Sequence, residues 1–527
     1  MDTKLIFVTG GVVSSIGKGI TAAALGRLLK ARGYKTSIMK FDPYLNVDPG
    51  IMNPYQHGEV FVTGDGAETD LDVGHYERFI NQNLTKLNYG TTGQIYSTVI
   101  DRERRGGYNG ETVQVIPHIT DEIKRRIRLA ADELKLDFLI VEIGGTVGDI
   151  ESQPFLEAIR QLKRDLAANQ CCFIHVTLIP YLRASGELKT KPTQHSVKEL
   201  QSIGIQPDVI VCRSERPLND SIRSKIALFC NVPKEAVIEN LNADSLYQVP
   251  LMLEETGFCS SVLQCLGVEQ RKPDLALWEK IVEADLAPKH KCTVALVGKY
   301  IELHDAYLSV VEALNHSGIA NSARVKIKWV ASEDLEKEPP EKLLNDVDGI
   351  IAPGGFCKKG LEGIITAARY ARENKIPYFG ICLGLQAAVI EFARDVLCWK
   401  DAHCDEVSKD TLHPVIAHTE GAQRRGGCIC KLKEGSRAYE MYGTPEIFER
   451  HHHSYEFNNE FADEFCTAGF EITGHNPQQK LVDIMELKEH PWFVCVQFHP
   501  EFTSRPVAAN PLFKGFIKTV LENQKEN

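Results

Sequence analysis

The sequence predicts an α/β protein with two domains, each a mostly parallel sheet with helices on both faces. Short apolar runs rich in β-branched and aromatic residues alternate with helical stretches in the first half of the chain. The same alternation begins again after a charged stretch in the middle. At 527 residues, the chain is also too long for one ordinary core. Short strands that alternate with helices form parallel sheets covered on both faces.

The first domain is predicted to cover residues 1–267. Its expected strands include residues 5–8, 37–42, 138–141, 173–178 and 209–211, and its expected helices include residues 22–32 and 121–134. Residues 268–291 are predicted to be an interdomain linker, because the apolar pattern weakens there into charged residues around one short helix at 277–285. The second domain is then predicted to cover residues 292–527, with strands that include 293–297, 349–352, 378–381 and 493–498.

Composition excludes several classes of protein. A hydrophobic content of 43% and a charged content of 25% are typical of soluble globular proteins. The formal net charge of −11 argues against a nucleic-acid or acidic-membrane binder, because such proteins need a broad basic face. The 15 cysteines include no CxxC pair, and the N-terminus lacks a signal-peptide pattern. No run approaches the roughly 18 apolar residues of a membrane helix, so a cytoplasmic location is expected.

Two stretches of the second domain resemble the two halves of a site that hydrolyses the side-chain amide of glutamine. Cys382 lies between Gly380 and Gly384 after an apolar run, and His499 and Glu501 follow the last predicted strand. Together they offer a thiol nucleophile, an imidazole base and a carboxylate that orients the base. A helix that begins after Cys382 would favour the reactive thiolate. Alone, Cys382 would be interpreted as a buried core thiol, so this hypothesis depends on the downstream His-x-Glu.

The strongest motif of the first domain is the glycine-rich stretch 10–19, which follows a predicted strand and precedes a predicted helix. Backbone N–H groups at such a place can bind phosphates, and Lys18 adds a positive charge. The stretch is not a strict Walker A motif, because Gly19 stands where Ser or Thr is usual. A plain glycine-rich turn with a solvated lysine is the alternative. Lys40, at the end of the next strand, makes that alternative weaker, because open α/β sheets bind ligands at such ends.

Acidic and basic residues follow at further strand ends. Asp72 and Glu142 could share a Mg²⁺ ion that bridges ATP phosphates, although surface acids are more often simply solvated. Lys189 and Lys191, in a loop that also contains Thr and Gly, and Lys225 further on would suit a second triphosphate. An exposed basic loop is the competing interpretation. The chain is therefore expected to bind more than one nucleotide.

These motifs together resemble the CTP synthase family, the glutamine-dependent UTP amidoligases. In the first domain the resemblance rests on residues 10–19, 41–44, 57–59, 70–72, 114–118, 142–152 and 189–194. In the second domain, residues 353–356, Cys382 and 499–501 are similar to the family's class I glutaminase domain. The motifs occur in the expected order over nearly the whole chain.

The resemblance implies that ATP phosphorylates O4 of UTP and that ammonia from glutamine then attacks C4. It implies that Lys18 and Lys40 assist phosphoryl transfer, with magnesium on Asp72 and Glu142. The implied ATP-binding residues are Ser15, Ile16, Gly17, Lys18, Gly19, Ile20 and Asp72. The implied UTP- and CTP-binding residues are Ser14, Lys40, Asp149, Ile150, Glu151, Lys189, Thr190, Lys191, Pro192, Thr193, Gln194 and Lys225. Recognition of cytosine by residues 149–151 implies feedback inhibition by CTP.

The implied glutamine site departs from the family at one position. Its implied residues are Gly354, Gly355, Phe356, Leu383, Gly384, Leu385, Gln386, Glu406 and Ser454. Gly354, Gly355 and the N–H after Cys382 would form the oxyanion hole. Ser454 stands where the family has the arginine that holds the glutamine carboxylate, and serine cannot supply a bidentate fork. Arg450 is a candidate replacement, and alternation of faces along a strand argues against a metal on the three histidines 451–453.

Regulation and assembly are also implied by the resemblance. Lys359 stands where the family has an arginine in a lid that takes part in activation by GTP, so GTP is an expected activator. An ammonia channel is implied, with His57 as a lining residue, and a homotetramer that can assemble into filaments is expected. Two alternatives stay open: an amidoligase that acts on a carboxylate, such as a cobyrinic-acid amidase, or a regulatory, filament-forming homologue with a weakened glutaminase.

Overall fold

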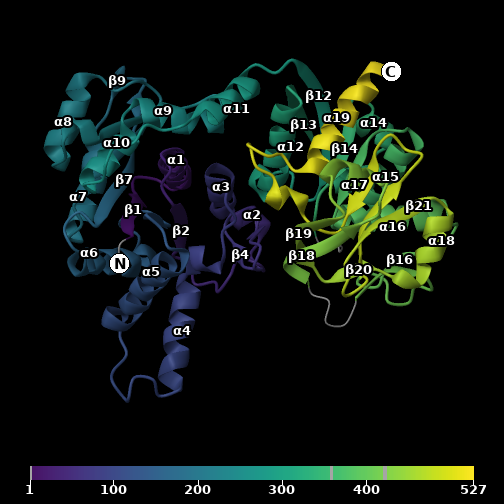
Figure 1. Ribbon diagram of the computed structural model, residues 1–527, viewed down its shortest axis with the longest axis horizontal. Coiled ribbons are helices and arrows are strands. Elements are labelled where there is room, and N and C mark those ends of the chain that lie inside the picture. The colour runs from purple at the N-terminus through teal and green to yellow at the C-terminus, as the bar shows by residue number, and fades with distance from the viewer. Residues whose placement is uncertain (1–2, 356–359, 419–423, 527) are drawn as a thin grey trace. The chain divides into compact units, whose positions relative to one another are not determined.

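The computed structural model describes residues 3–355, 360–418 and 424–526. The chain forms two compact units (Figure 1). The first unit comprises Met1–Pro49 and Asp72–Val282, and the second comprises Gly50–Leu71 and Glu283–Asn527. No helix of the described residues has both the length and the apolar character needed to cross a membrane.

The first unit is built on a seven-stranded sheet in which all neighbouring strands run parallel. In spatial order its strands are β11 (Val237–Leu241), β10 (Val209–Ser214), β7 (Cys171–Ile179), β1 (Lys4–Gly10), β6 (Phe138–Ile143), β2 (Thr36–Asp42) and β5 (Tyr89–Thr91). The central strands β1, β6 and β2 are buried almost throughout, which explains the continuous apolar runs 5–8 in β1 and 138–141 in β6.

Helices cover both faces of this sheet. One face packs against α1 (Lys18–Ala31), which also contacts α9 (Val249–Glu255) and α10 (Phe258–Cys265). The other face shares a buried apolar cluster with α4 (Thr92–Arg104), α5 (Thr120–Leu134), α6 (Gln153–Asp165) and α7 (Lys191–Ser202). In α5, Ile123, Ile127 and Ala131 recur every four residues and are buried, so one stripe of the helix faces the sheet.

The second unit contains a nine-stranded mixed sheet. Its parallel part, in spatial order, is β13 (Ala323–Ala331), β12 (His290–Gly298), β14 (Gly349–Ala352), β15 (Tyr378–Ile381) and β23 (Phe493–Val496). An antiparallel part continues with β22 (Val482–Leu487), β21 (Phe470–His475), β18 (Arg424–Leu432) and β19 (Glu446–His453). The parallel part carries the predicted catalytic residues at its strand ends.

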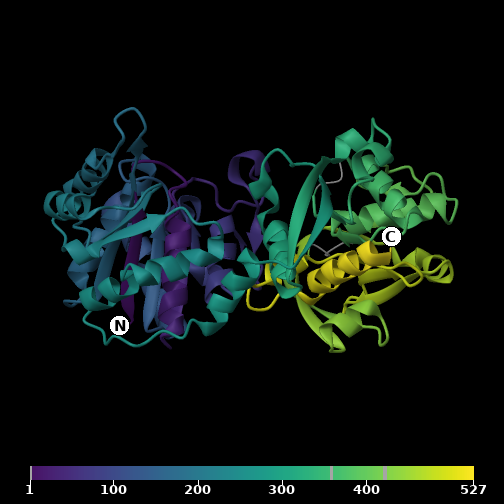
Figure 2. The same cartoon turned by 90° about the horizontal axis from the view of Figure 1, so that it is seen from above.

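Helices also cover both faces of the parallel part of the second sheet. One apolar cluster joins the sheet to α15 (Leu361–Glu373) and α16 (Leu383–Asp395). The other joins it to α12 (Leu308–Ala320) and α19 (Pro511–Glu526), the yellow C-terminal helix of Figure 2. The predicted α/β class, with helices on both faces of each sheet, is thus confirmed.

Smaller elements complete the two units. The first has the hairpin β8 (Tyr181–Leu182) and β9 (Glu187–Leu188), and the second has the pair β3 (Phe61–Val62) and β4 (Glu68–Thr69) and a sheet of β16 (His403–Cys404), β17 (Pro414–His418) and β20 (Tyr455–Phe457). The remaining α-helices are α2 (Pro54–His57), α3 (Leu71–Ile80), α8 (Asp220–Cys230), α11 (Ala276–Leu286), α13 (Ser332–Leu335), α14 (Pro340–Leu344), α17 (Arg437–Tyr442) and α18 (Ala462–Thr467). Two short 3₁₀ segments used below are η3 (Ile150–Ser152) and η8 (Pro500–Thr503).

The segment Gly50–Leu71 differs most from the sequence-based division. It belongs to the second unit, although the sequence places it inside the predicted first domain. The Glu59 carboxylate accepts hydrogen bonds from the Ser309 N–H and hydroxyl, at 3.1 and 2.5 Å, and the Phe61 ring packs on Phe502. Strand β12 also begins at His290, inside the predicted linker. The domain boundaries 1–267, 268–291 and 292–527, which assume contiguous domains, therefore stay a prediction.

Candidate active sites

Cys382 lies on a sharp turn between β15 and α16. Its backbone has φ 51° and ψ −99°, a strained conformation for a residue with a side chain. The Cys382 N–H donates to the carbonyl of Val496 at 2.7 Å, which ties the turn to β23. A Cβ on Gly384 would lie 2.1 Å from the carbonyl oxygen of Ala352, so this position needs glycine. The turn thus holds the thiol at the end of the parallel strands and at the start of a helix.

His499 and Glu501 reach the same place from the end of β23. The Nδ1 atom of His499 lies 2.7 Å from Oε1 of Glu501, and the His499 N–H donates to the Arg450 carbonyl at 2.7 Å. Burial disfavours the charged imidazolium, yet Glu501 and the neighbouring Cys382 hold the pKa of His499 well above its usual value. The three side chains predicted from the sequence therefore lie close together, as the predicted roles of nucleophile, base and orienting carboxylate require.

Gln497 is a neighbour of the thiol that the sequence did not reveal. Its side chain is fully buried, and its Nε2 atom donates toward Sγ of Cys382 at 3.7 Å. Its backbone N–H donates to the Asp483 carbonyl at 2.9 Å, which fixes it at the end of the sheet. The available signal was a single amide in an otherwise apolar predicted strand, just before His499.

Gly354 and Gly355 follow β14 and lie beside the catalytic residues. A Cβ on Gly354 would lie 2.7 Å from Cε1 of His499, and one on Gly355 would lie 3.3 Å from Cδ2 of Leu383. Glycines let this backbone approach the histidine closely. Phe356 and Lys359, predicted to act in glutamine binding and GTP activation, lie outside the described residues.

The remaining predicted glutamine-site residues surround the start of α16. Leu383, Leu385 and Gln386 are buried, and Gln386 Nε2 donates to the carbonyl of Tyr455 at 3.2 Å. Half-buried Ser454 directly precedes Tyr455, at the junction of β19 and β20. Half-buried Glu406 follows β16, in the small sheet that contains β20. Gln386 and the Ser454–Tyr455 junction are therefore adjacent.

Arg450 is directed elsewhere in the second unit. Its Nη1 donates to the carbonyl of Val62 at 2.9 Å, and its guanidinium lies 5.4 Å from the centre of the Phe61 ring. These contacts give no support to Arg450 as a replacement for the missing arginine. They bind β19 to the segment Gly50–Leu71.

The histidines 451–453 alternate between faces, as the strand pattern predicted. The rings of His451 and His453 lie 5.3 Å apart, while His452 Nε2 lies 2.7 Å from Oε1 of Glu68. His57, the predicted channel residue, is in α2 of the same unit, with Nε2 3.6 Å from Oδ2 of Asp70.

The glycine-rich loop of the first unit connects β1 to α1. Gly17 has φ 92° and Ser15 has φ 54°, both in the left-handed region. Lys18 is buried, and its Nζ donates to the carbonyl of Gly145 at 2.8 Å. A Cβ on Gly19 would lie 2.3 Å from Oδ1 of Asp72, so glycine at this position lets a carboxylate approach the loop.

Lys40, Asp72 and Glu142 form a cluster beside this loop, in which Lys40 and Glu142 are buried and Asp72 is half-buried. Lys40 Nζ lies 2.6 Å from Oδ2 of Asp72. Burial and the charge of Asp72 raise the pKa of Glu142 to about 7, even though Lys40 and Lys18 lower it. Burial also works against ionisation of Asp72, but Lys40, His75 and Lys18 hold its pKa below the usual value. Two carboxylates that resist joint ionisation form a donor set that fits a divalent cation.

The predicted second phosphate segment lies next to the loop. A Cβ on Gly11 would lie 1.7 Å from the Ser196 hydroxyl in α7, so the loop and α7 touch. The predicted residues Lys191, Pro192, Thr193 and Gln194 form the first turn of α7. Buried Gln194 donates to the Thr190 hydroxyl at 3.0 Å, while Lys189 pairs with Glu187. The start of α7 is thus placed beside the loop.

The other predicted nucleotide residues lie on neighbouring segments of the first unit. Exposed Asp149, Ile150 and Glu151 begin η3, and Asp149 accepts a hydrogen bond from the Thr146 N–H at 3.0 Å. The Val147 N–H donates to the carbonyl of Gly10 at 2.8 Å, which ties this segment to the loop. Ser14 is exposed in the loop, and Lys225 is exposed on α8.

A pocket of about 230 Å³ opens beside the loop. Ser15, Ile16, Gly17 and Ile20 line it together with Arg213, Asn240, Ala243, Leu246 and Val249. Arg213 Nη1 donates to Oδ1 of Asn240 at 3.1 Å. Sequence patterns did not indicate Arg213, Asn240, Ala243, Leu246 and Val249, because residues near strand ends and helix starts give no local signal without a glycine or charge pattern.

Comparison with known proteins gives matches to both halves of the chain. Residues 4–268 match the family model described as CTP synthase N-terminus, and residues 302–519 match glutamine amidotransferase class-I. A CTP synthase of Carboxydothermus hydrogenoformans is 59% identical, covering 99% of this chain and 99% of its own. One of Clostridium kluyveri is 58% identical, with the same coverage. A solved structure of the Trypanosoma brucei CTPS glutaminase domain with bound acivicin is 34% identical, covering 44% of this chain and 94% of that chain, with a TM-score of 0.42.

Proposed function

The chain belongs to the CTP synthase family, and we propose that it is a ligase that aminates UTP to CTP with ammonia released from glutamine. The observation that carries this function is the presence of two complementary sites in one chain. The second unit holds Cys382, His499 and Glu501 as a complete amide-hydrolysing set. The first unit holds a phosphate loop beside Lys40 and two carboxylates.

In the first unit, the loop residues Ser15 to Ile20 would bind the ATP phosphates through backbone N–H groups and the start of α1. The pocket lined by Arg213, Asn240 and Leu246 is the place for the rest of ATP. Lys18 and Lys40 stabilise charge as the γ-phosphoryl group passes to O4 of UTP. Ammonia then attacks C4, the phosphorylated oxygen leaves as phosphate, and CTP and ADP are formed.

Asp72 and Glu142 are the residues that would hold magnesium. Their proximity, the close approach of Asp72 to Gly19 and the raised pKa of Glu142 support this assignment. A bound Mg²⁺ ion would neutralise phosphate charge. Lys40 positions the Asp72 carboxylate for this role.

The UTP triphosphate is assigned to the segment around α7. Lys189, Lys191 and Lys225 supply charge, and the start of α7 supplies N–H groups. Ser14, Thr190, Pro192, Thr193 and Gln194 complete this group. Asp149, Ile150 and Glu151 are assigned to the pyrimidine of UTP or CTP, which supports feedback inhibition by CTP.

In the second unit, the Cys382 thiolate attacks the side-chain amide carbon of glutamine. Its proton, held on His499, passes to the leaving nitrogen, so ammonia departs and a thioester remains. His499 then accepts a proton from water, which hydrolyses the thioester to glutamate. The N–H groups of Gly355 and Leu383 are the proposed donors to the oxyanion, and Gln386, Glu406 and Ser454 line the substrate.

Regulation, assembly and location extend the proposal. GTP is proposed as an activator, and a homotetramer that can assemble into filaments is the proposed assembly. The sequence domains 1–267 and 292–527 are proposed with support from the family-model matches 4–268 and 302–519. Cysteine usage without a disulfide pattern supports a cytoplasmic location.

The two alternative functions have weaker support. A carboxylate acceptor would not explain similarity to CTP synthases along 99% of the chain. A purely regulatory role would not explain why Cys382 lies beside the hydrogen-bonded pair His499 and Glu501.

The test supplies the purified protein with UTP, ATP and Mg²⁺, and with either glutamine or ammonium chloride, and measures CTP. We expect CTP from both nitrogen sources. We expect Cys382→Ala to lose only the glutamine-driven reaction. CTP from neither source would refute the proposed function. Equal loss of both reactions in the variant would refute the assignment of ammonia release to the second unit and of UTP amination to the first.

A further inference from the structure

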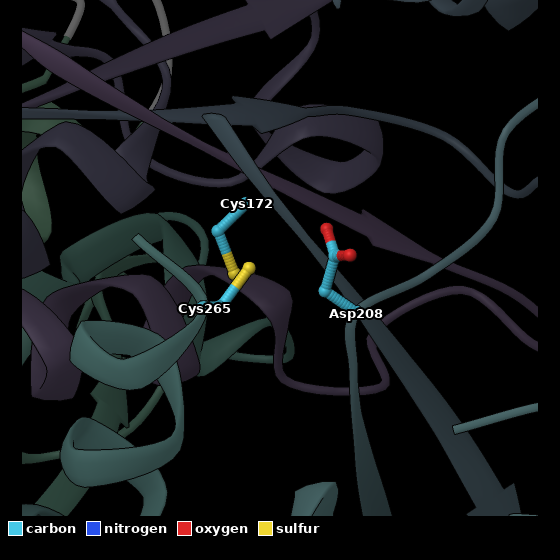
Figure 3. A group of neighbouring side chains, drawn as sticks. All are labelled: Cys172, Asp208 and Cys265. Atoms are coloured by element: carbon cyan, nitrogen blue, oxygen red, sulfur yellow. The ribbon is translucent and has the colours of Figure 1, made fainter. Parts of the chain in front are cut away.

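A group of three potential metal ligands lies in the first unit at a place that the proposed reaction does not use. Cys172 is in β7, Asp208 directly precedes β10, and Cys265 ends α10. Figure 3 shows the two sulfur atoms directed toward each other, with the Asp208 carboxylate beside them. We propose that these three residues bind a thiophilic divalent cation of the Zn²⁺ class.

The distances suit a single ion. The two sulfurs and a carboxylate oxygen all lie within 4.8 Å of one another. Zinc bonds to sulfur at about 2.3 Å and to carboxylate oxygen at about 2.0–2.2 Å, so ligand atoms at this upper limit would each move inward by roughly half an ångström to bind one ion. Cys172 is fully buried, while Asp208 and Cys265 are half-buried. Solvent can therefore supply water as the fourth ligand.

The chemistry of the group also favours a cation. Two thiolates and a carboxylate would place three negative charges together, and a divalent ion compensates two of them. Binding would release the two thiol protons to solvent.

Asp208 has a structural role as well, which supplies a control. Its Oδ2 accepts a hydrogen bond from the Phe173 N–H at 2.8 Å. Asp137, which directly precedes β6, accepts from the Lys35 N–H in the same way at 2.8 Å. Among the described residues, Asp137 belongs to no group of potential metal ligands. The backbone contact explains both aspartates, but it does not explain the convergence of two thiols on Asp208.

The position indicates a structural ion. Cys172 is the second residue of β7 and Asp208 precedes the first residue of β10, so both lie at the N-terminal edge of the parallel sheet. The phosphate loop follows the C-terminal end of β1, at the opposite edge. An ion here would join β7, β10 and α10, and would stabilise the first unit without contact with nucleotide.

The experiment uses the full chain, reduced, freed of metal with a chelator and titrated with Co²⁺ without oxygen. Thiolate-bound cobalt is expected to give a sulfur-to-metal charge-transfer band, which added Zn²⁺ should abolish. Cys265→Ser should weaken the charge-transfer band, because one of the two thiolate ligands is removed. Asp208→Asn should weaken cobalt binding at least tenfold. Asp137→Asn and Cys466→Ser, an exposed thiol, should leave the band unchanged. Zn²⁺ should raise the melting temperature of the parent chain but not of Cys265→Ser.

Two results would overturn the proposal. One is the same cobalt spectrum in the parent, Cys265→Ser and Asp208→Asn, which would place the bound metal elsewhere. The other is a Cys172–Cys265 disulfide found by mass spectrometry in the chain purified without reductant, with no cobalt band after reduction. In that case the pair is a redox pair and not a metal site.

Discussion

The sequence predicts that the glutamine site departs from the family pattern at Ser454. It is half-buried at the β19–β20 junction, next to Tyr455, whose carbonyl accepts from Gln386. We expect Ser454→Arg to lower the KM for glutamine about tenfold, because a charge-assisted hydrogen bond contributes about 1.5–3 kcal/mol. The measurement is CTP formation against glutamine concentration, with ammonium-driven CTP as the unchanged reference. Ser454→Met, of similar reach but uncharged, is the control, and an unchanged KM in Ser454→Arg would mean that another group holds the carboxylate.

Gln497 lies beside the nucleophile and is expected to stabilise its thiolate. Its Nε2 is 3.7 Å from Cys382 Sγ, and its side chain is fully buried. Gln497→Leu keeps the size and removes the donor, a loss of about 1 kcal/mol. We therefore expect about fivefold slower alkylation of Cys382 by iodoacetamide near pH 7, and slower glutamine hydrolysis. Exposed Cys398 in the same sample is the internal reference. An unchanged ratio of the two alkylation rates would exclude this role.

At the scale of elements, Glu449 joins β19 to three other segments behind the catalytic residues. It accepts hydrogen bonds from Tyr442 at 2.7 Å, Thr503 at 2.8 Å and Asn510 at 3.0 Å. Burial raises its pKa to about 7, although these partners lower it. Its neutral form is thus favoured in the folded state, so its contribution to stability is complete below pH ~4.5 and is lost as pH rises through about 7.

Glu449→Gln should therefore make stability less dependent on pH. A pKa difference of this size corresponds to on the order of 3 kcal/mol, and 1 kcal/mol shifts the melting temperature of a domain of this size by about 2–4 °C. Between pH 5 and pH 8, we expect the melting temperature of the variant to rise by several degrees relative to the parent. Glu446→Gln, exposed on the same strand, should show no such trend. Parallel curves for parent and Glu449→Gln would contradict the assignment.

Sequence patterns could predict the elements that depend on local rules. Strands such as β6 and β15 are mainly apolar because both faces of their sheets are covered, and the ends of β2, β6 and β15 indicated where Lys40, Glu142 and Cys382 lie. In the sequence, Gly19 stands where a Walker A motif usually has Ser or Thr. In the structure, the Asp72 carboxylate lies so close to Gly19 that a side chain there would clash with it. Gln497 could not be predicted, because its role depends on the pairing of β15 with β23, which no local pattern encodes.

At the scale of the whole molecule, the order of residues along the chain does not match their division between the two units. The segment Gly50–Leu71 has only two-residue strands and no long apolar run, so nothing local in it indicates the second unit. Its placement depends on distant partners, such as Ser309 for Glu59 and Val62 for Arg450. The glutaminase unit is thus completed by residues that precede most of the synthetase unit in sequence.

This division predicts that a substitution near the N-terminus impairs glutamine use more than CTP synthesis itself. Phe61 is fully buried, and its ring centre lies 5.1 Å from that of Phe502 in η8, next to Glu501. We expect Phe61→Ala to cost the second unit about 3–5 kcal/mol and to displace η8. Glutamine-driven CTP formation should then fall at least tenfold, while ammonium-driven formation persists. Phe61→Leu should show a smaller effect in the same direction.

Phe79→Ala, at a fully buried position of the first unit, should instead reduce ammonium-driven synthesis. Equal loss of both reactions in Phe61→Ala and Phe61→Leu would show that residues 50–71 serve the synthetase and not the glutaminase.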